Sequence, residues 1–564
     1  MTGADVALAC MRSFVAGLVA HGLTDACLSP GSRSTPLALA LHRTHGVRVH
    51  VHLDERAAAF FALGLAKATG RPVAVACTSG TAVSEYLPAL VEASMTRAPL
   101  LALTADRPPE LHGVGANQTI DQEGIFDRWV RCSIQAEVPG DRPDALYWQG
   151  LATNAWWRAV QHPPLPVHVN LPFREPLVPS GEPVTLGDAT IAHADMTTGP
   201  VHITPQEATW MAELVARHDR GLVVAGSLRT PPSQVLRLAL GAGWPVAAEP
   251  TSGLRVPGAL SAPTALLADE RFASSHLPDV VLQLGAAPTS RAGLALAAAA
   301  PRLVIVDPDD LVADPHRRAE TRIVAGVDSV AVSTASRLEP RTDAPWLRTW
   351  LEADARTRAA VDGLLDGWDE PFEGRVARDV AVAMPDGGVV VVGSSMPVRD
   401  LDLFMAPRDG LRVLANRGAS GIDGFVSTAL GVAAAGAPTV GLLGDLTLLH
   451  DVGSLLWSAR RGHDLVLVVL NNGGGTIFSF LSQRDLPPDE LEALFTTPHG
   501  LDLAAVCAAA GAGHHRVERA DELVPAIDRG WAVGGVQVVE VVVDAELDRR
   551  RHDEVREAVA ETLG

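Results

Sequence analysis

The sequence lacks the features of nucleic-acid-binding, disulfide-stabilised and nicotinamide-dependent proteins. It contains no block of lysine and arginine and its net charge is −20, so we expect it to repel nucleic acid and anionic membranes. The five cysteines are scattered without a C-x-x-C pair, which is typical of reduced thiols in a cytosolic enzyme rather than of disulfides or a zinc site. No G-x-G-x-x-G motif lies at a strand–helix junction, which argues against a nicotinamide cofactor.

Long apolar runs and histidine metal motifs are also missing. No uninterrupted apolar run is long enough to cross a bilayer and no basic segment precedes an apolar stretch near the N-terminus, so we expect a soluble, cytoplasmic protein without stable membrane association. Apolar residues near the N-terminus instead recur at helical spacing, which predicts a helix that ends at Gly22. The 19 histidines form no H-E-x-x-H motif, and we interpret them as structural or solvated.

The length of 564 residues is too great for one hydrophobic core and suggests three or four domains. Hydrophobic residues make up 47% and charged residues 20%, which is ordinary for a globular protein. Two stretches are predicted linkers. Residues 174–204 contain several prolines and glycines, and residues 326–345 are rich in serine, threonine and proline. They divide the chain into predicted domains 1–185, 200–330 and 345–564.

Short apolar runs alternate with alanine- and leucine-rich stretches of helical period, which predicts an α/β fold. Several runs are apolar at nearly every position, as expected for parallel strands covered on both faces. The predicted strands are 26–29, 47–51, 73–77, 100–104, 167–171, 222–225, 280–284, 303–306, 389–392, 439–443, 465–470 and 536–543. Motifs with polar residues or glycine follow several strands of the first and third predicted domains. Because ligands bind at the carboxyl ends of parallel strands, we expect one composite site between domains or subunits.

Asp445 and Asn472 each follow a predicted strand and are separated by about one strand–helix–strand unit. This spacing would bring a carboxylate and an amide oxygen together, and both are hard ligands that suit Mg²⁺ bound to a diphosphate. The triple glycine 473–475 would let the backbone approach a metal or phosphate closely. The alternative is that both residues are ordinary turn residues.

Glu55 follows the predicted strand 47–51 and opens a predicted helix, 57–68. An acidic residue there is often present only because it complements the helix dipole. Beside a metal–diphosphate motif the functional interpretation becomes specific, because thiamin diphosphate needs a carboxylate in an apolar pocket to share a proton with its aminopyrimidine ring. We interpret Asp54 as a structural or solvated neighbour.

Four arginines lie at or just beyond predicted strand ends, on loops with glycine or proline: Arg33, Arg107, Arg399 and Arg417. A single arginine of this kind is usually solvated, but four together favour binding of carboxylates, which a guanidinium holds with two hydrogen bonds. The pattern therefore predicts substrates with several negative charges.

The sequence resembles the thiamin-diphosphate-dependent decarboxylase superfamily and, within it, the MenD-type 2-succinyl-5-enolpyruvyl-6-hydroxy-3-cyclohexene-1-carboxylate (SEPHCHC) synthase family. The matching segments are SPGSRSTPLALAL (29–41), LDERAAAFFALGLA (53–66), TSGTAV (78–83), TADRPPEL (104–111), GANQTIDQ (115–122), GSSMPVRDLD (393–402), NRGASGIDG (416–424), GDLTLLHD (444–451) and NNGGGTIF (471–478). They lie in the first and third predicted domains, and the middle one contains almost no motif.

The resemblance implies a pyrimidine-binding domain, a central domain of modified Rossmann type and a diphosphate-binding domain, each a mostly parallel sheet flanked by helices. It implies a homodimer or homotetramer in which the first domain of one subunit and the third domain of another form each site. The implied cofactors are thiamin diphosphate and Mg²⁺ or Mn²⁺.

The resemblance also implies a role for each motif residue. Glu55 would activate the cofactor, and the metal ligands would be Asp445, Asn472 and the carbonyl of Gly474. The residues expected to handle isochorismate are Ser32, Arg33, Arg107 and Gln118, and Gln118 is also expected to assist proton transfer. Those expected near the moiety derived from 2-oxoglutarate are Ser395, Arg399 and Arg417. The other expected cofactor-binding residues are Thr78, Ser394, Ile422, Gly444, Leu446, Thr447, Ile477, Phe478 and Leu481; without the resemblance, the large apolar ones among them would be taken as core.

Two positions depart from the usual patterns. The Gly-Asp-Gly of the superfamily is Gly444-Asp445-Leu446 here, and leucine at this position is shared with the SEPHCHC synthases. The basic residue of the central domain near isochorismate is often lysine, whereas the nearest candidate here is Arg291.

The implied activity is that of a decarboxylating transferase of menaquinone biosynthesis that forms a C–C bond. 2-Oxoglutarate would lose CO₂ on thiamin diphosphate, and the succinyl carbanion would add to isochorismate in a 1,4-addition. Two alternatives stay open. One is another thiamin enzyme, such as an acetolactate synthase, which commonly binds FAD, or a 2-ketoacid decarboxylase. The other is a non-catalytic nucleotide-binding or regulatory protein that keeps the fold.

Overall fold

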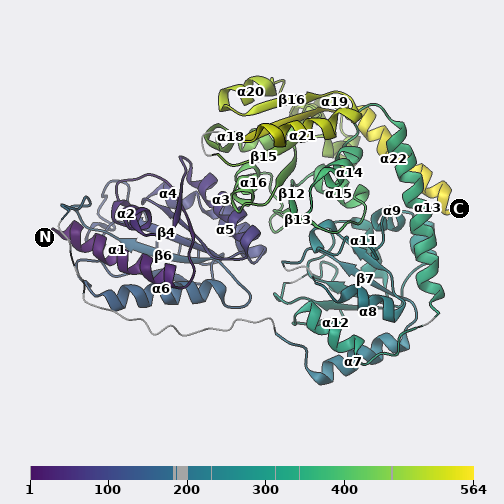
Figure 1. Cartoon of the computed structure of the whole chain (residues 1–564), viewed down its shortest axis with the longest axis horizontal. Coiled ribbons are helices and arrows are strands. Elements are labelled where there is room, and N and C mark those ends of the chain that lie inside the picture. The colour runs from purple at the N-terminus through teal and green to yellow at the C-terminus, as the bar shows by residue number, and fades with distance from the viewer. Residues whose placement is uncertain are drawn as a thin grey trace. The chain divides into compact units, whose positions relative to one another are not determined.

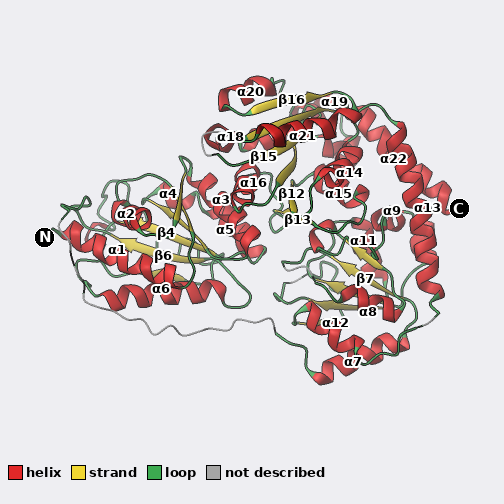
Figure 2. Cartoon of the chain, viewed as in Figure 1, coloured by secondary structure: helices red, strands yellow, loops and turns green. Residues whose placement is uncertain are grey.

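The computed structural model describes residues 2–181, 184, 186, 201–229, 232–311, 313–341, 343–458 and 462–564. The chain forms two compact units, each assembled from separate segments. Unit 1 comprises residues 1–198, 416–436 and 450–463, and unit 2 comprises residues 199–415, 437–449 and 464–564. Figures 1 and 2 show the helices and strands of both units.

Unit 1 is built on a six-stranded parallel sheet with the strand order β2-β1-β3-β4-β6-β5. Its strands are β1 (Asp25–Leu28), β2 (Arg48–Val51), β3 (Val73–Cys77), β4 (Leu100–Asp106), β5 (Ser133–Gln135) and β6 (Val167–Pro172). The four central strands β1, β3, β4 and β6 are buried along their whole length, because helices cover both faces of the sheet.

The helices of unit 1 are α1 (Gly3–Ala20), α2 (Thr35–Arg43), α3 (Glu55–Thr69), α4 (Thr81–Ser84), α5 (Leu87–Met95), the 3₁₀ turn η1 (Pro109–Leu111), α6 (Ala145–Val160), α16 (Phe425–Ala434) and α18 (Val452–Ser458). α1 and α6 lie side by side and bury apolar residues such as Phe14 and Trp148 on one face of the sheet (Figure 1). α3 packs on the other face, against β1, β3 and β4, and α16 packs on α3.

The N-terminal helix α1 forms as predicted. Its first turn is capped by Thr2, whose side chain accepts from the N–H of Asp5, and it ends at Ala20, before Gly22 at φ +111°. Among the described residues, α1 is the one helix long and apolar enough to cross a membrane, and half of its most apolar window is buried. Its side chains Phe14 and Leu18 belong to the core of unit 1, as in an internal helix of a globular domain.

Unit 2 contains a five-stranded and a six-stranded parallel sheet, with the orders β11-β10-β9-β7-β8 and β13-β12-β14-β15-β17-β16. The first consists of β7 (Gly221–Ala225), β8 (Val246–Ala248), β9 (Val280–Leu284), β10 (Arg302–Val306) and β11 (Thr321–Ile323). The second consists of β12 (Gly388–Val392), β13 (Leu411–Ala415), β14 (Thr439–Gly444), β15 (Leu465–Asn471), β16 (Gly513–Val517) and β17 (Val536–Val542). The predicted α/β class with three parallel sheets is confirmed.

Helices flank both sheets of unit 2 (Figure 2). Around the first sheet they are α7 (Pro205–Arg217), α8 (Val235–Ala242), η2 (Pro250–Ser252), α9 (Pro263–Ala268), α10 (Glu270–Ser275), α11 (Arg291–Ala299) and α12 (Val327–Ala335). The remaining ones are α13 (Pro345–Gly367), α14 (Glu373–Ala383), α15 (Met396–Phe404), α17 (Asp445–His450), η3 (Thr476–Phe480), η4 (Ser482–Asp485), α19 (Pro488–Leu491), η5 (Glu492–Thr496), α20 (Leu503–Ala510), η6 (Ala520–Glu522), α21 (Leu523–Val533) and α22 (Ala545–Leu563).

The two predicted linkers have different outcomes. Much of the first, residues 174–204, lies outside the described residues. The second was wrong over α12, because Val327, Val330 and Ala331 are buried in the core of the five-stranded sheet although the segment is rich in serine and threonine. The predicted domain limits stay a prediction, since the compact units are not continuous in sequence.

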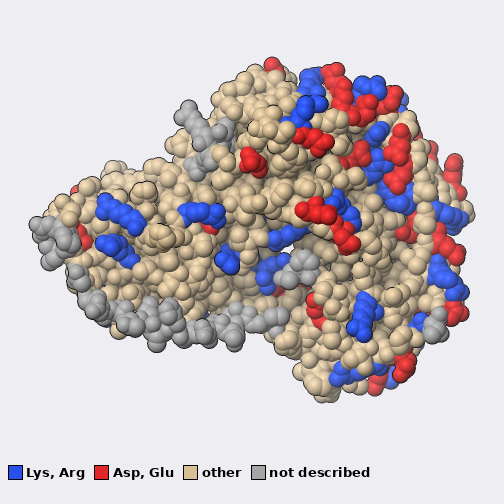
Figure 3. All heavy atoms as spheres, viewed as in Figure 1, with Lys and Arg blue, Asp and Glu red and all other residues tan. Residues whose placement is uncertain are grey.

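Charged side chains of both signs are interspersed on the face shown in Figure 3. Among the described residues, Arg378 on α14 pairs with Asp366 at 2.7 Å, and Arg551 on α22 lies 3.5 Å from Glu370. These two arginines are thus balanced by neighbouring carboxylates.

Candidate active site

Glu55 is the first residue of α3, directly after the loop that follows β2. The preceding Asp54 caps the helix, since its Oδ1 accepts a hydrogen bond from the N–H of Ala57 at 3.1 Å, so it is a structural neighbour as expected. Glu55 is half-buried, and burial raises the pKa of its carboxyl, with smaller contributions from the charges of Asp54 and Glu85. Its environment therefore favours a carboxyl that holds a proton.

Two arginines lie close together at the carboxyl ends of the strands of unit 1. Arg33 follows β1, is 6% exposed and donates from Nη1 to the carbonyl of Phe173 at 2.9 Å. Arg107 follows β4 and donates to the hydroxyl of Ser79. Burial and the nearby charge of Arg33 lower the pKa of Arg107, and the buried Nε of Arg33 has no hydrogen-bond partner among the described residues. Arg33 also pairs through Nη2 with the exposed Glu175 at 3.2 Å, so the spare donor and the charge of Arg107 are what remain for an anion.

The neighbouring motif loops of unit 1 touch one another. A Cβ on Gly31 would overlap the side chain of Thr78, so the loop that carries the exposed Ser32 passes directly over the end of β3. Gln118 has φ +55° and donates from Nε2 to the carbonyl of Ser79 at 2.8 Å. The predicted residues Ser32, Arg33, Thr78, Arg107 and Gln118 thus occupy one edge of the sheet.

The loop before α16, which carries Arg417 and Ile422, is attached to a buried ion pair. Lys67 on α3 donates to Glu92 at 3.0 Å and to Oδ1 of Asn416 at 2.8 Å. Glu92 also accepts from the N–H groups of residues 418 and 419, at 3.1 and 2.7 Å. The side chains of Lys67 and Glu92 are 9% and 3% exposed. The pair therefore fixes the start of the loop.

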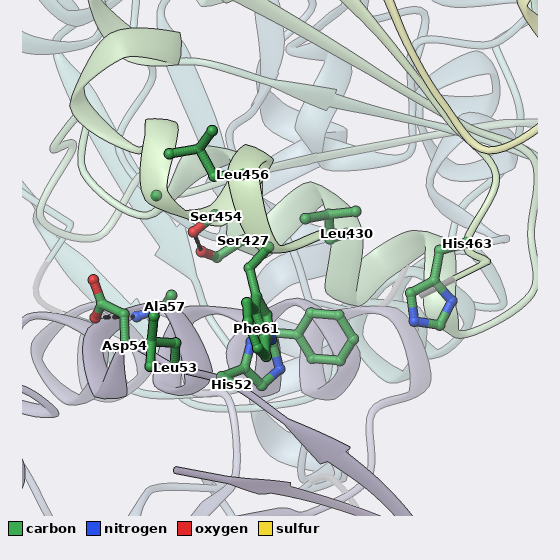
Figure 4. A pocket seen from close by; sticks show the side chains of 12 residues that line it. His52, Leu53, Asp54, Ala57, Phe61, Ser427, Leu430, Ser454, Leu456 and His463 are labelled. Atoms are coloured by element: carbon green, nitrogen blue, oxygen red, sulfur yellow. Dashed lines mark hydrogen bonds between the residues drawn. The ribbon is translucent and has the colours of Figure 1, made fainter. Parts of the chain in front are cut away.

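A cavity of about 230 Å³ lies beside the same helix, within unit 1. Figure 4 shows Phe61 of α3 and Leu430 of α16 on its wall, with Asp54 at one side, where its hydrogen bond to Ala57 is drawn. None of the residues predicted for the site lines it. This cavity beside α3 is therefore not the predicted site.

In unit 2, Asp445 and Asn472 follow adjacent parallel strands, as their spacing predicts, because β14 pairs with β15 through Gly444 and Leu470. Asp445 is 1% exposed, and burial raises the pKa of its carboxyl. Its Oδ2 accepts from the N–H of Gly473 at 2.9 Å and lies 3.3 Å from His499 Nε2. The carboxylate is thus held directly against the glycine segment.

The amide of Asn472 is oriented by several partners. Its Nδ2 donates to Glu373 Oε1 at 2.6 Å and to Thr476 Oγ1 at 2.8 Å, while its Oδ1 accepts from the N–H of Gly474 at 3.3 Å. Gly474 has φ +155°, and a Cβ there would overlap the carbonyl of Thr496, so only glycine fits.

The carboxyl end of β12, next to β14, carries the serine motif. Ser394 is 6% exposed, and its hydroxyl has no hydrogen-bond partner among the described residues. Ser395 has φ +74° and precedes α15, and the exposed Arg399 donates from Nη1 to its carbonyl. Leu446 is half-buried and Thr447 is buried in the first turn of α17.

The predicted apolar wall lies on and just after η3. Ile477, Phe478 and Leu481 are half-buried, and the ring of Phe478 packs against that of Phe495 at a centroid distance of 5.2 Å. Ile422, by contrast, belongs to unit 1. Arg291 begins α11, beside the five-stranded sheet, and its role stays a prediction.

Family models match most of the chain. Residues 9–125 match the N-terminal TPP (thiamine pyrophosphate) binding domain of thiamine pyrophosphate enzymes, residues 193–392 the middle domain, and residues 400–541 the C-terminal TPP binding domain.

Three relatives are similar over nearly their full length. Proteins of Thermobifida fusca, Chloroflexus aurantiacus and Geobacillus kaustophilus are 43%, 41% and 39% identical, over 97%, 93% and 99% of this chain and 98%, 91% and 100% of their own. Each is named 2-succinyl-5-enolpyruvyl-6-hydroxy-3-cyclohexene-1-carboxylate synthase. The chain belongs to the SEPHCHC synthase family of thiamine pyrophosphate enzymes. The family resemblance drawn from the motifs is thereby confirmed.

The residues of unit 2 fit the cofactor of a SEPHCHC synthase. The buried Ser394 hydroxyl has no partner among the residues that the structure describes, and a Cβ on Gly444 or Gly473 would meet none of their atoms within 4 Å, so there is room beside the strand ends. No group of three or more His, Cys, Asp or Glu side chains suited to a metal occurs in the part of the chain that the structure describes. A metal at Asp445 would therefore need amide and carbonyl oxygens as further ligands, which Asn472 and Gly474 can supply.

Four residues at these sites were missed from the sequence. They are Lys67, Glu92, Glu373 and His499, which contact motif residues from distant segments. A charged residue on a predicted helix has no local signal that separates it from a solvated one. For Lys67 a signal was available, since it is the only lysine in the chain.

Proposed function

We propose that the chain catalyses the SEPHCHC synthase reaction of menaquinone biosynthesis. It decarboxylates 2-oxoglutarate and adds the succinyl unit to the ring double bond of isochorismate in a 1,4-addition, with release of CO₂. The observation that carries this proposal is the similarity over nearly the full length of three relatives with that name. The neighbouring guanidinium groups of Arg33 and Arg107 support substrates with several carboxylates.

The proposed cofactors are thiamin diphosphate and Mg²⁺ or Mn²⁺. When bound, thiamin diphosphate supplies a carbon centre that accepts the electrons left when CO₂ departs. Asp445, Asn472 and the Gly474 carbonyl would hold the metal. Residues of both units would hold the rest of the cofactor: Thr78 and Ile422 of unit 1, and Ser394, Gly444, Leu446, Thr447, Ile477, Phe478 and Leu481 of unit 2.

Glu55 is the proposed proton-sharing group. Burial raises its pKa, so its carboxyl keeps a proton at higher pH than an exposed glutamate does. A group whose pKa lies nearer to neutrality exchanges a proton more efficiently, and the aminopyrimidine nitrogen of the cofactor is its proposed partner.

The arginines and their neighbours orient the two substrates. Arg33 and Arg107, with Ser32 and Gln118, are proposed to bind isochorismate. Ser395, Arg399 and Arg417 are proposed to bind the carboxylates of 2-oxoglutarate. When both substrates are held in a fixed orientation, one direction of attack is favoured, and the reacting atoms no longer depend on a slow bimolecular encounter.

The proposed assembly is a cytoplasmic homodimer or homotetramer. Glu55 lies in unit 1, whereas Asp445 and Asn472 lie in unit 2. The cofactor-activating group and the metal ligands must meet in one site, and we propose that they meet across a subunit interface. The motif-bearing predicted domains are 1–185 and 345–564, with 200–330 as the central domain.

The activity is tested by product analysis. The purified protein is incubated with Mg²⁺, thiamin diphosphate and 2-oxoglutarate, with and without isochorismate, and the product is identified by mass. We expect the succinyl adduct only when isochorismate is present. CO₂ release from pyruvate in place of 2-oxoglutarate, or bound FAD in the absorption spectrum, would support another thiamin enzyme, and absence of the adduct contradicts the proposal.

The role of Glu55 is tested by a matched pair of variants. We expect Glu55→Gln to lower kcat by about 10²–10⁴-fold, the usual contribution of a positioned proton-transfer group, while thiamin diphosphate still binds. Asp54→Asn keeps an N-cap of equal quality and should keep most of the activity. A protein with normal cofactor binding and no activity even before substitution would instead be a non-catalytic member of the fold.

A further inference from the structure

The orientation of the Asn472 amide depends on groups behind it. An asparagine side chain has one oxygen and one NH₂ group, and the oxygen must face a metal for coordination. Nδ2 of Asn472 donates to Glu373 Oε1 at 2.6 Å and to Thr476 Oγ1 at 2.8 Å. Among the residues that the structure describes, the side-chain oxygen accepts only the long bond from Gly474, at 3.3 Å, so a lone pair remains for a further partner.

Glu373 is fixed in position by burial and by a backbone hydrogen bond. It is 1% exposed, and its backbone N–H donates to Oδ1 of Asp548 on α22 at 2.9 Å. The preceding residue, Phe372, is also 1% exposed, and its ring packs 5.4 Å from Phe404 and 4.7 Å from the ring of His552. The start of α14 therefore has little freedom to move.

The surroundings of Glu373 connect it to α15 as well. His552 Nε2 lies 2.9 Å from Asp400 Oδ1, and its Nδ1 lies 3.3 Å from Asp548 Oδ2. Asp400 follows Arg399 in the chain. One buried cluster thus supports the metal-binding loop and the helix that carries a proposed substrate arginine.

We propose that Glu373 is a positioning residue for the metal site. It accepts a hydrogen bond from the Asn472 NH₂ group, which fixes the orientation of the amide and turns its oxygen toward the metal. A carboxyl keeps an acceptor oxygen whether or not it carries a proton, so this function does not depend on its protonation state. Without Glu373 the amide can rotate by half a turn and present N–H groups to the cation, which repel it. The inference rests on the proposed metal site at Asp445 and Asn472.

The test measures metal affinity rather than turnover. Mn²⁺ binding to the protein with thiamin diphosphate is followed by electron paramagnetic resonance of free Mn²⁺. We expect Glu373→Ala to weaken Mn²⁺ binding by about 10–100-fold, as for other residues that orient a metal ligand. Glu373→Gln should recover part of the loss, because its amide oxygen accepts the same bond. Glu370→Ala, at an exposed position three residues upstream, should bind Mn²⁺ normally.

A second background separates orientation from general support of the fold. Asn472→Asp presents two equivalent oxygens, so it needs no partner to choose between them. In that background, Glu373→Gln should leave Mn²⁺ binding unchanged or make it stronger, because it also removes the repulsion between two carboxylates. A residue that only stabilises the fold would weaken binding equally in both backgrounds, which would overturn the inference. This comparison remains decisive if Glu373→Ala does not fold.

Mn²⁺ binding by an Asn472 variant distinguishes an error in the role of Glu373 from an error in the proposed metal site. If Asn472→Ala weakens Mn²⁺ binding but Glu373→Ala does not, the positioning role is wrong and the site stands. If Asn472→Ala itself binds Mn²⁺ like the unchanged protein, the metal site proposed at Asn472 is wrong, and with it the role of Glu373.

Discussion

At the scale of single residues, burial controls the protonation of Glu55. The carboxyl is half-buried at the start of α3, and desolvation raises its pKa, with Asp54 and Glu85 acting in the same direction. Between the ordinary glutamate pKa and this raised value, the folded chain holds a proton that the unfolded chain has released. The contribution of Glu55 to the free energy of unfolding therefore falls as the pH rises through that range.

A single substitution isolates this contribution. We expect Glu55→Gln, which cannot ionise, to remove this part of the pH dependence, so that the variant gains stability relative to the unchanged protein as the pH rises from acidic to neutral. Urea unfolding of the cofactor-free protein at a series of pH values measures it. Glu137→Gln, at an exposed glutamate of the same unit, is the matched control for removal of one carboxyl. A constant difference between Glu55→Gln and the unchanged protein at every pH would contradict the argument.

Lys67 is the only lysine in the chain, and its side chain is buried against Glu92 and Asn416. Every other basic residue counted as lysine or arginine is arginine, yet this buried position keeps an ammonium group bonded to Glu92 and Asn416. A guanidinium is planar and larger than an ammonium group, so arginine is not an equivalent replacement for the contacts with Glu92 and Asn416. Apart from Lys67 being the only lysine, nothing in the sequence marks Lys67 or Glu92 as buried. Their pairing is visible only in the packing of α3 against the loop before α16.

Breaking this pair should destabilise the protein strongly. Removal of one partner of a buried ion pair costs about 3–5 kcal/mol, because the other charge stays buried without compensation. We expect Lys67→Met to lower the free energy of unfolding by about that amount. The double variant Lys67→Met/Glu92→Leu should be less destabilised than Lys67→Met alone, as measured by chemical denaturation. If the loss of stability in the double variant equals the sum of the losses in Lys67→Met and Glu92→Leu, the two side chains are not coupled.

At the scale of elements, α3 and α16 approach so closely that glycine is needed at the contact. A Cβ on Gly64 of α3 would overlap the carbonyl oxygen of Thr428, and one on Gly431 of α16 would overlap the carbonyl oxygen of Phe61. Glycine inside a helix is otherwise unfavourable relative to alanine by about 1 kcal/mol. Its presence at both positions indicates that close packing outweighs helix propensity here.

The same substitution should have opposite effects at two glycines of unit 1. Gly64→Ala gains about 1 kcal/mol of helix propensity, but overpacking against a backbone atom that cannot rotate away costs about 1–3 kcal/mol or more. We expect it to lower the melting temperature. Gly150→Ala on α6, where a Cβ meets no atom within 4 Å, should raise it. A stabilised Gly64→Ala variant would show that the two helices separate at no cost.

The elements also show how far sequence patterns reach. Strands buried on both faces, such as β3 and β9, were predicted at their observed limits, because every position of β3 and all but Gln283 of β9 are apolar. The half-exposed strands β5, β13 and β16 were missed, since they mix polar with apolar residues and lack a continuous run. In the same way, Asp445 and Asn472 were predicted to follow adjacent strands because strand ends mark them, and that position is confirmed. Glu373 and His499 were not, because only the fold brings them to those strand ends.

At the scale of the whole molecule, the proposed site has two halves in one sequence. Glu55 and the Arg33–Arg107 pair belong to unit 1, and Asp445 with Asn472 belongs to unit 2. A symmetric dimer joins such halves either within each subunit or across the interface. The two arrangements predict different activities for dimers whose subunits carry different substitutions, and activity measurements distinguish them.

Mixed dimers of two inactive variants should recover activity if the halves join across the interface. In a heterodimer of Glu55→Gln and Asp445→Ala, one site receives both substitutions and the other receives neither. Random assortment makes half of the dimers mixed, so co-expressed variants should reach about a quarter of the unchanged activity. The control combines Glu55→Gln with Arg33→Ala, because both changes lie in unit 1 and each mixed dimer then has one substitution in each site. If the halves join within each subunit, the Glu55→Gln and Asp445→Ala mixture stays as inactive as the control.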